Sequence, residues 1–349
     1  MTEPAERQRR RPPRPGSSLG DVARLAGVSS QTVSRVARGE DTVRPETAMR
    51  VREAMRKLNY IPNPAARALR SGTFHSIGVV AHRISRTGEG HIVQAIIEAA
   101  RAAGYTVVLV DSPSTTSADL SRAIAQLTRT VDGLVIVTME APSPQGVELP
   151  AQLPTVVGDF RWAGSRTSVG SDQADGTRQA IEHLLGLGHR TVHHVAGPAT
   201  SVQATAREDA WRAALRAAGR PMPEPLVGDW SPASGYRAGR VLAAEPDATA
   251  IFCANDEMAQ GVLRALHEAG RDIPGDVSVV GFDDLMAEYL WPPLTTVRQD
   301  FEQTGRELVR TLLEQIDSHG EEPIQRIVVP TQLVVRRSTG VARVGTTSG

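Results

Sequence analysis

The side chains best suited to reading DNA lie in one short segment near the N-terminus. Between Ser29 and Arg38, apolar residues recur at helical spacing, so that one face is apolar and the opposite face is polar. Glutamine can pair with adenine and arginine with guanine in the major groove, while small hydroxyls suit phosphate oxygens. The polar face carries Ser30, Gln31, Ser34, Arg35 and Arg38. The alternative is a solvated face on a generic helical bundle.

The residues around this segment predict a helix-turn-helix. Ser18 can cap a first helix, Gly27 can form a left-handed turn, and Ser29 can cap the second helix. A third helix is predicted from Pro45, because proline is favoured in the first turn. The apolar positions expected to form a small core are Leu19, Val22, Ala23, Leu25, Ala26, Val33, Val36, Ala37, Ala48, Val51, Met55 and Leu58.

The charge distribution favours an anionic partner for this N-terminal region. The chain has 39 Lys and Arg and 39 Asp and Glu, but residues 1–72 hold 15 basic and seven acidic residues. Their excess of eight positive charges is balanced by an acidic remainder, and this argues against the generic bundle. Residues 1–17 read as a disordered basic tail rather than a signal peptide.

Cysteine content and hydropathy indicate the cellular compartment in which the protein is expected. Cys253 is the single cysteine, so no intrachain disulfide is possible, which fits a reducing cytosol. No stretch approaches the roughly 20 apolar residues that span a bilayer. A soluble, cytoplasmic protein is therefore expected.

From Ser76 onward, short β-branched runs alternate with amphipathic segments, which predicts an α/β fold with mostly parallel sheets in two lobes. The expected strands are 77–81, 105–110, 133–137, 154–158, 191–196, 249–254 and 277–282. The expected helices include Val93–Ala103, Ser117–Thr128, Gly176–Gly186, Ala206–Ala218, Gly235–Ala244 and Asp256–Ala269.

Over roughly residues 18–338 the sequence resembles the lactose/galactose repressor family of bacterial transcriptional regulators. The motifs that carry the resemblance are Asp21-Val-Ala, Ala26-Gly-Val-Ser29, Gln31-Thr-Val-Ser-Arg-Val36, Leu58-Asn-Tyr-Ile-Pro-Asn63, Gly158-Asp159, His183-Leu184, Leu187-Gly-His189, Ala196-Gly-Pro198, Gly228-Asp-Trp-Ser231, Ala254-Asn-Asp256, Val279-Val-Gly-Phe-Asp-Asp284, Pro292-Pro-Leu-Thr-Thr296 and Gln299-Asp300. The resemblance implies a homodimeric, effector-controlled regulator whose effector domain is periplasmic-binding-protein-like.

The resemblance also implies a domain order. A helix-turn-helix head (18–62) is followed by a hinge helix and linker (63–74), an effector-binding and dimerisation domain (75–340) and a flexible tail (341–349). The N-lobe is expected at about 75–172 and 298–326, and the C-lobe at about 173–297 and 327–340. The tail has no leucine heptads, so a dimer rather than a tetramer is expected.

By resemblance, Ser30 and Gln31 fall where the family varies the bases it reads, and Arg35 falls on a base-contacting position. The segment Ala65–Arg70 matches a hinge helix, with Leu69 as the minor-groove wedge. Arg44 departs from the family, which often has a serine cap there. The expected DNA contacts are Ser18, Ser29, Ser30, Gln31, Thr32, Ser34, Arg35, Arg38, Tyr60, Asn63, Ala66 and Leu69.

The implied effector pocket has residue types that suit a sugar, because an indole can stack on a pyranose and Asp, Asn and Arg can bond vicinal hydroxyls. The implied pocket residues are Asp159, Arg207, Trp230, Asn255, Asp283 and Gln299. A core aromatic and an internal ion pair are the alternatives for Trp230 and for Asp283 with Arg207. His82 and Arg86 replace small or apolar family residues, and a cation there would suit an acidic or phosphorylated sugar. Alternatively, Arg86 points to solvent.

The favoured function is a repressor of carbohydrate-utilisation genes that a sugar or sugar derivative releases from a palindromic operator. The alternatives are a corepressor-type regulator, a sugar-binding protein without a regulatory role, and a carbohydrate enzyme fused to a DNA-binding module. No catalytic site, metal site or cofactor is expected: His189, His193 and His194 are interpreted as structural residues, and Asp283-Asp284 lacks the neighbouring carboxylates of a hydrolase.

Overall fold

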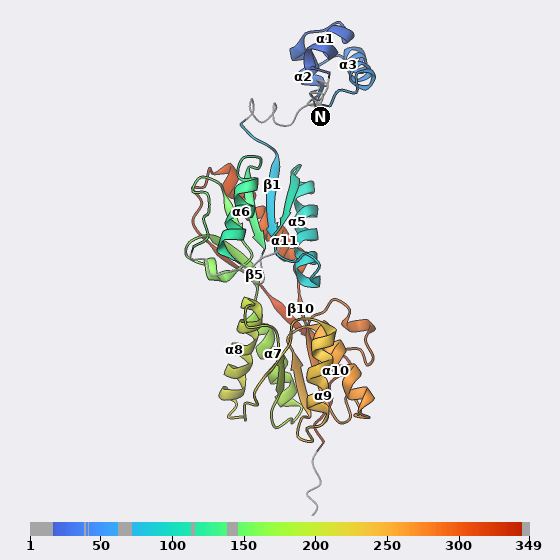
Figure 1. Ribbon diagram of the computed structural model, residues 1–349, viewed down its shortest axis with the longest axis vertical. Coiled ribbons are helices and arrows are strands. Elements are labelled where there is room, and N and C mark those ends of the chain that lie inside the picture. Colours follow the sequence, from blue (N-terminus) through green and yellow to red (C-terminus); the bar gives the residue numbers. More distant parts are fainter. Residues whose placement is uncertain are drawn as a thin grey trace, which may run out of the picture. The chain divides into compact units, whose positions relative to one another are not determined.

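The computed structural model describes residues 17–37, 40, 42–61, 72–112, 116–137 and 146–343 (Figure 1). The chain divides into two compact units, Met1–Phe74 and His75–Gly349. The first unit contains the predicted helical head, and the second contains two α/β lobes. No helix within these described ranges is long and apolar enough to cross a membrane.

The head contains α1 (Leu19–Ala26), α2 (Ser30–Ala37) and α3 (Pro45–Lys57). Ser18 caps α1 in a reciprocal capping box with Asp21, and Gly27 ends the helix at φ 65°. Val22, Val33 and Val51 are fully buried between the three helices. Leu25, expected in this core, is instead 52% exposed. An eight-residue helix buries a single narrow stripe, and Leu25 lies outside the stripe formed by Val22, Ala23 and Ala26.

The N-lobe is a six-stranded parallel sheet with the order β11-β5-β4-β3-β1-β2. Helices α5 (Thr87–Ala102) and α11 (Phe301–Asp317) pack together over one face, and α6 (Ser117–Leu127) covers the other. A short 3-10 helix, η1 (Phe160–Trp162), follows β4. The strands are β1 (Ser76–Ala81), β2 (Thr106–Asp111), β3 (Gly133–Val137), β4 (Thr155–Val157), β5 (Thr167–Ser171) and β11 (Arg326–Val329).

The C-lobe is a second six-stranded sheet with the order β12-β10-β9-β8-β6-β7, in which β12 alone is antiparallel to its neighbour. Helices α7 (Gln173–Gly186) and α8 (Val202–Ala217) share one core, while α9 (Pro232–Ala243) and α10 (Asp256–Glu268) share another. A 3-10 helix, η2 (Ala287–Tyr289), follows β9. The strands are β6 (His193–Ala196), β7 (Leu226–Val227), β8 (Ala250–Cys253), β9 (Ser278–Asp283), β10 (Thr295–Gln299) and β12 (Thr331–Val334).

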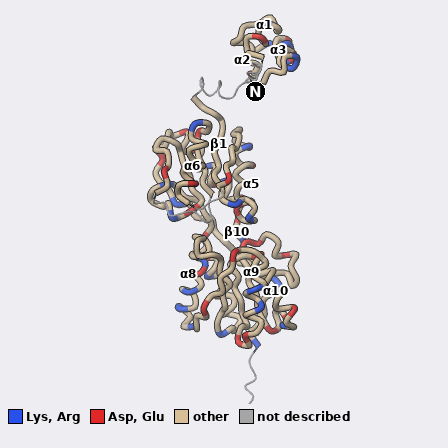
Figure 2. The backbone as a smooth tube through the Cα atoms, in the orientation of Figure 1, with Lys and Arg blue, Asp and Glu red and all other residues tan. Residues whose placement is uncertain are grey.

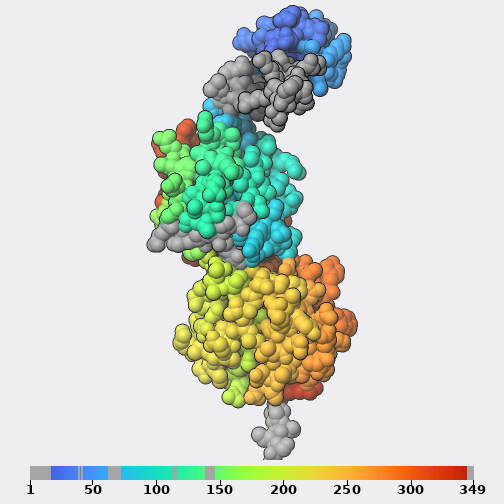
Figure 3. Space-filling model, viewed as in Figure 1, coloured from blue at the N-terminus to red at the C-terminus, as the bar shows by residue number. Residues whose placement is uncertain are grey.

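Three crossovers join the lobes of the second unit, which touch each other (Figure 3). The first lies between β5 and α7, the second follows Gln299 at the end of β10, and the third is at Pro330 between β11 and β12. The second and third therefore lie a few residues beyond the expected boundaries at 298 and 327. The reason is that β10 stays paired with β12 through Gln299, and β11 stays paired with β5 through Val329.

The histidines interpreted as structural lie in or near the C-lobe sheet. His189 makes hydrogen-bonding contacts to Thr249 and Ser278, and the Nδ1 atom of His194 lies 3.0 Å from the Phe252 carbonyl oxygen. Burial lowers the pKa of His194 to about 4, so it is neutral at pH 7.

Candidate functional site

The helix α2 has two distinct faces, as its sequence predicts. Val33 and Val36 are buried against the rest of the head, whereas Ser30, Gln31 and Arg35 are exposed. The Ser29 hydroxyl accepts a hydrogen bond from the Thr32 backbone N–H at 3.2 Å, which fixes the start of the helix. The resulting outward face holds one amide, one guanidinium and one hydroxyl, which are groups that can bond base edges.

The exposed face keeps Arg35 available for a partner. Its Nε atom lies 3.9 Å from the Glu40 carboxylate, and the two side chains are 45% and 37% exposed. An ion pair this long and this exposed is worth little, so exchanging it for a guanine contact costs little. The third helix adds four cations, Arg50, Arg52, Arg56 and Lys57, and Figure 2 shows blue along α3.

The other expected DNA contacts are distributed over the head. Ser18 donates a 2.7 Å hydrogen bond from its hydroxyl to Asp21, while Ser34 and Tyr60 are half-buried. Arg44 precedes α3 without a side-chain capping bond, as its type predicts. Arg38, Asn63, Ala66 and Leu69, together with the hinge segment 65–70, lie outside the described residues.

A cleft opens in the second unit where the carboxyl ends of the parallel strands of both lobes meet the first turns of the following helices. Both lobes contribute to it, and Thr87 donates a hydrogen bond to Glu257 across it. The lining residues are Arg86, Thr87 and Gly88 from the N-lobe and Gln203, Arg207, Trp230, Asn255, Glu257 and Asp283 from the C-lobe.

Arg207 is a buried cation of this cleft and is only 3% exposed. Its Nε–H donates to Gln173 at 2.8 Å, one terminal N–H donates to the Ala254 carbonyl oxygen, and the other lies 3.6 Å from Asp283. The guanidinium also lies 3.7 Å from the centre of the Phe282 ring. Burial lowers the pKa of Arg207 to about 10, so it stays charged at pH 7.

Two buried carboxylates lie beside Arg207. Burial raises the pKa of Asp283 to about 6, although Arg207 and the hydrogen bond from Gln299 oppose this shift. Burial and then the charge of Asp283 raise the pKa of Asp256 to about 8, although Thr296 donates to it at 2.6 Å. At pH 7 Asp283 is therefore mostly an acceptor-only carboxylate, whereas Asp256 is mostly protonated.

Trp230 both lines the cleft and belongs to the C-lobe core. It has a φ of 73°, and its carbonyl oxygen accepts a 3.1 Å hydrogen bond from Asn255. The ring presses against Gly197, where a Cβ atom would lie 2.6 Å from the indole. Its indole N–H is buried and has no hydrogen-bond partner among the described residues. Trp230 therefore lines the cleft and also packs in the C-lobe core.

Three expected pocket residues do not line the cleft. His82 is 2% exposed, and its Nδ1 atom lies 2.6 Å from the Ser112 carbonyl oxygen. Asp159 caps η1 and binds Arg161 through contacts of 2.8 and 2.9 Å. Gln299 supports the site from behind, because it donates to Asp283 at 2.7 Å and accepts from Gln173 at 2.8 Å. These side chains are instead committed to their own neighbours.

The cleft also contains residues that the sequence did not single out, namely Thr87, Gly88, Gln203 and Glu257. Glu257 had a detectable signal, because it follows Asn255 and Asp256 in the first turn of a helix that begins directly after a strand. Arg86, for which solvent exposure was the alternative, lines the cleft.

Comparison with known proteins identifies both units. Residues 18–63 match the bacterial regulatory proteins of the lacI family, and residues 181–339 match a periplasmic binding protein-like domain. The HTH-type transcriptional regulator CelR of Thermobifida fusca is 35% identical over 95% of this chain and 99% of its own length. The chain belongs to the lacI family.

Solved structures of relatives support the same architecture for this lacI-family regulator. The lac repressor dimer bound to operator and the anti-inducer ONPF is 32% identical, with a TM-score of 0.81 over 93% of this chain and 100% of the other. The CelR–cellobiose complex is 34% identical, with a TM-score of 0.67 over 92% and 99% of the two chains. The chain is therefore a DNA-binding transcriptional regulator rather than an enzyme, with a lacI-type head and an effector domain.

Proposed function

We propose that this regulator is a cytoplasmic homodimeric repressor that binds a palindromic operator and is released from it when a sugar occupies the cleft. The observation that carries the proposal is the pairing of two sites in one chain. An exposed Gln and Arg face on α2 suits base edges, and a cleft with Trp230 beside Asn255 and Asp283 suits a polyol. A dimer presents two copies of α2 to successive major grooves.

On the DNA side, Gln31 and Arg35 read bases, with Ser30 adjusting the preference. Ser18, Ser29, Thr32, Ser34 and Tyr60 bind phosphates, and these fix the register without carrying sequence information. Arg38, Asn63, Ala66 and Leu69 complete the proposed set, with Leu69 as a wedge that bends the operator centre.

On the effector side, Trp230 stacks on the apolar face of a sugar ring, while Asp283 and Asn255 accept or donate bonds to its hydroxyls. Discrimination arises because a sugar with the wrong hydroxyl leaves one of these buried groups unpaired, which costs about 1–3 kcal/mol. The relative solved with cellobiose supports a sugar as the effector class.

A second candidate effector class is favoured by Arg86, which lines the N-lobe side of the cleft. An acidic or phosphorylated sugar would gain a charge-assisted bond there. Calorimetric titration with glucose 6-phosphate and glucose, and with cellobionic acid and cellobiose, separates the classes. Preference for the acidic member in the wild type, and its loss in Arg86→Leu, supports the acidic effector. Equal binding of neutral and acidic members to both proteins contradicts it.

The function itself is tested by capturing genomic fragments on the full-length protein and sequencing them. A shared palindromic motif next to carbohydrate genes is expected. Each sugar is then added to the protein–fragment complex, and release is followed by fluorescence anisotropy. Binding that tightens with sugar would identify the corepressor alternative, and a protein that captures no common motif would contradict the proposal.

A further inference from the structure

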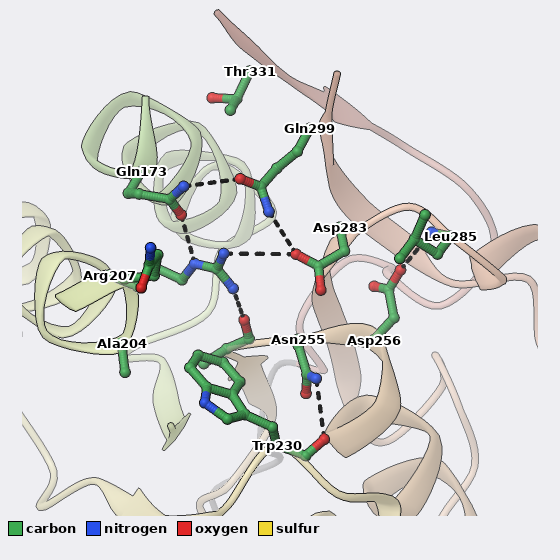
Figure 4. A network of polar contacts seen from close by, with 12 residues as sticks. Gln173, Ala204, Arg207, Trp230, Asn255, Asp256, Asp283, Leu285, Gln299 and Thr331 are labelled. Atoms are coloured by element: carbon green, nitrogen blue, oxygen red, sulfur yellow. Dashed lines mark hydrogen bonds and ion pairs between the residues drawn. The ribbon is translucent and has the colours of Figure 1, made fainter. Parts of the chain in front are cut away.

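Three hydrogen bonds and one ion pair join four side chains in a ring beneath the cleft (Figure 4). Arg207 donates from Nε to the Gln173 amide oxygen at 2.8 Å, and the Gln173 amide nitrogen donates to the Gln299 oxygen at 2.8 Å. The Gln299 amide nitrogen donates to Asp283 at 2.7 Å, and Asp283 lies 3.6 Å from the Arg207 guanidinium. Two members, Arg207 and Asp283, line the cleft, while Gln173 and Gln299 support them from behind.

From Arg207 through the two glutamines to Asp283, each residue donates to the next, which fixes the orientation of both amides. Arg207 has only donors, so it requires the oxygen of Gln173, and this turns the Gln173 nitrogen toward Gln299. Gln299 must then accept with its oxygen and present its own nitrogen to Asp283. Reversing either amide would place two donors or two acceptors face to face. The orientation of the Gln173 amide therefore decides whether Asp283 receives a hydrogen bond from the Gln299 amide nitrogen.

The two glutamines lie at two different crossovers between the lobes. Gln173 is the first residue of α7, directly after the first crossover, and Gln299 is the last residue of β10, directly before the second. The neighbouring Asp172 connects to the third crossover, because its carbonyl oxygen accepts from the Thr331 hydroxyl and its N–H donates to Val329, both at 2.9 Å. A change in the arrangement of the crossovers would therefore move Gln173 and Gln299, the two residues that support Arg207 and Asp283.

We propose that Gln173 is a positioning residue that orients Arg207 and Asp283 for the effector and makes that orientation depend on the arrangement of the three crossovers. This inference rests on the proposed function, since it names the support of the same effector site. It also supplies the physical link that an effector needs, because a ligand shifts a lobe equilibrium only through different affinities for its states.

The test compares full-length Gln173→Leu with Gln179→Leu. Gln179 is a matched control because it lies on the same helix, is also half-buried, and bonds to Thr331 and Leu333 in the third crossover and β12 without touching the ring. Cellobiose, lactose and glucose 6-phosphate are the probes, titrated calorimetrically at pH 5 to 8. Gln173→Leu is expected to bind the probe that the wild type prefers about 10-fold more weakly, and Gln179→Leu within about twofold.

The pH profile separates positioning from general stability. Asp283 faces Arg207 from α8, Asp256 and Glu257 from α10 and Gln299 from β10. Losing the oriented Gln299 bond raises the pKa of Asp283 above about 6, so probe affinity in Gln173→Leu is lost at a higher pH than in the wild type. Adding Asp283→Asn is expected to abolish this difference.

A second experiment is done without sugar, so that its result does not depend on the proposed effectors. Urea unfolding across the same pH range should give a steeper loss of stability with rising pH for Gln173→Leu, and a uniform offset for Gln179→Leu. If no probe binds the wild type, the proposed effector classes fail while this unfolding profile still decides on Gln173. Parallel profiles for Gln173→Leu and the wild type would overturn the inference, as would equal probe affinities of the two leucine variants.

Discussion

The reading face of the head and the effector cleft use the same residue types in opposite ways. On α2, Ser30, Gln31 and Arg35, which we propose to face DNA, are exposed, and the ion pair of Arg35 with Glu40 spans 3.9 Å. In the cleft, Arg207 and Asp283 are held by several short bonds and have shifted pKa values. On a face that meets a large charged partner, polar side chains can lack protein hydrogen-bond partners, because water bonds to them. In a cleft for a small ligand, the buried polar groups must have protein partners and the right orientation even when the cleft is empty. Substitutions in the head should therefore act locally, and substitutions in the cleft should spread to neighbours.

The largest effect is expected from Asp283→Asn, which keeps the shape but removes the charge opposite Arg207. The affinity for the effector sugar should fall about 100-fold or more, because one acceptor oxygen is replaced by an amide donor and Arg207 loses the negative charge opposite it. Operator affinity without sugar should remain within about twofold. Isothermal titration and anisotropy measure the two quantities.

Its matched control is Asp284→Asn at the next position. Asp284 binds Arg298 and Arg336 at 2.7 Å and does not line the cleft. This variant should lose stability and keep its response to sugar. An unchanged sugar affinity in Asp283→Asn would contradict the view that the cleft, unlike the head, depends on preorganised buried groups.

The next largest effect is expected from Arg35→Ala, at about 1–3 kcal/mol of specific operator affinity per half-site if the guanidinium reads a guanine. The fold of the head should be unaffected, since Arg35 is exposed. Arg24→Ala, an exposed arginine on α1, is the control and should change operator affinity only slightly. Equal weakening on specific and random DNA would show that Arg35 contacts phosphate alone.

A smaller effect is expected from Asp256→Asn, and it depends on pH. The pKa of Asp256 is raised to about 8, above the ordinary value near 4 for aspartate. The folded protein therefore holds a proton that the unfolded chain releases between these values, and the wild type loses stability as pH rises through that window. Relative to the wild type, the variant should be about 1–3 kcal/mol more stable at pH 9 than at pH 5, measured by urea unfolding. Asp209→Asn, at an exposed position, is the control.

The smallest effect is expected from Arg44→Ser, which supplies the hydroxyl cap that α3 lacks. The head should gain about 0.5–1 kcal/mol in thermal unfolding. Operator affinity should fall slightly if Arg44 contacts a phosphate. A head that is not stabilised would show that the backbone at residue 44 does not accept a capping side chain.

The head could be predicted almost entirely from sequence because its signals are local. Ser18, Gly27 and Ser29 act within a few residues of the backbone that they cap or turn. The prediction that Leu25 lies in the core was wrong, because a short helix has too few turns for its sequence to define the buried stripe.

The cleft was only partly predictable, because its residues come together from elements far apart in the chain. Strands such as β5 and β10 carry Thr, Ser, Arg and Gln, so they escaped a search for apolar runs. Gln173 begins the helix that follows β5 and meets Gln299, 126 positions away, so no spacing rule could pair them. The family resemblance placed Arg207, Trp230 and Asp283, but it could not show that His82 and Asp159 are committed to Ser112 and Arg161.

The central claim is that occupancy of the cleft controls the affinity of the head for its operator. The most direct measurement is the anisotropy of a labelled operator, taken from the genomic capture, titrated with the full-length wild type and with Asp283→Asn in the presence and absence of the effector sugar. Sugar is expected to weaken wild-type binding about 10-fold or more, and Asp283→Asn is expected to bind equally well with and without it. Wild-type affinity that no sugar changes, or an Asp283→Asn protein that still responds fully, would contradict it.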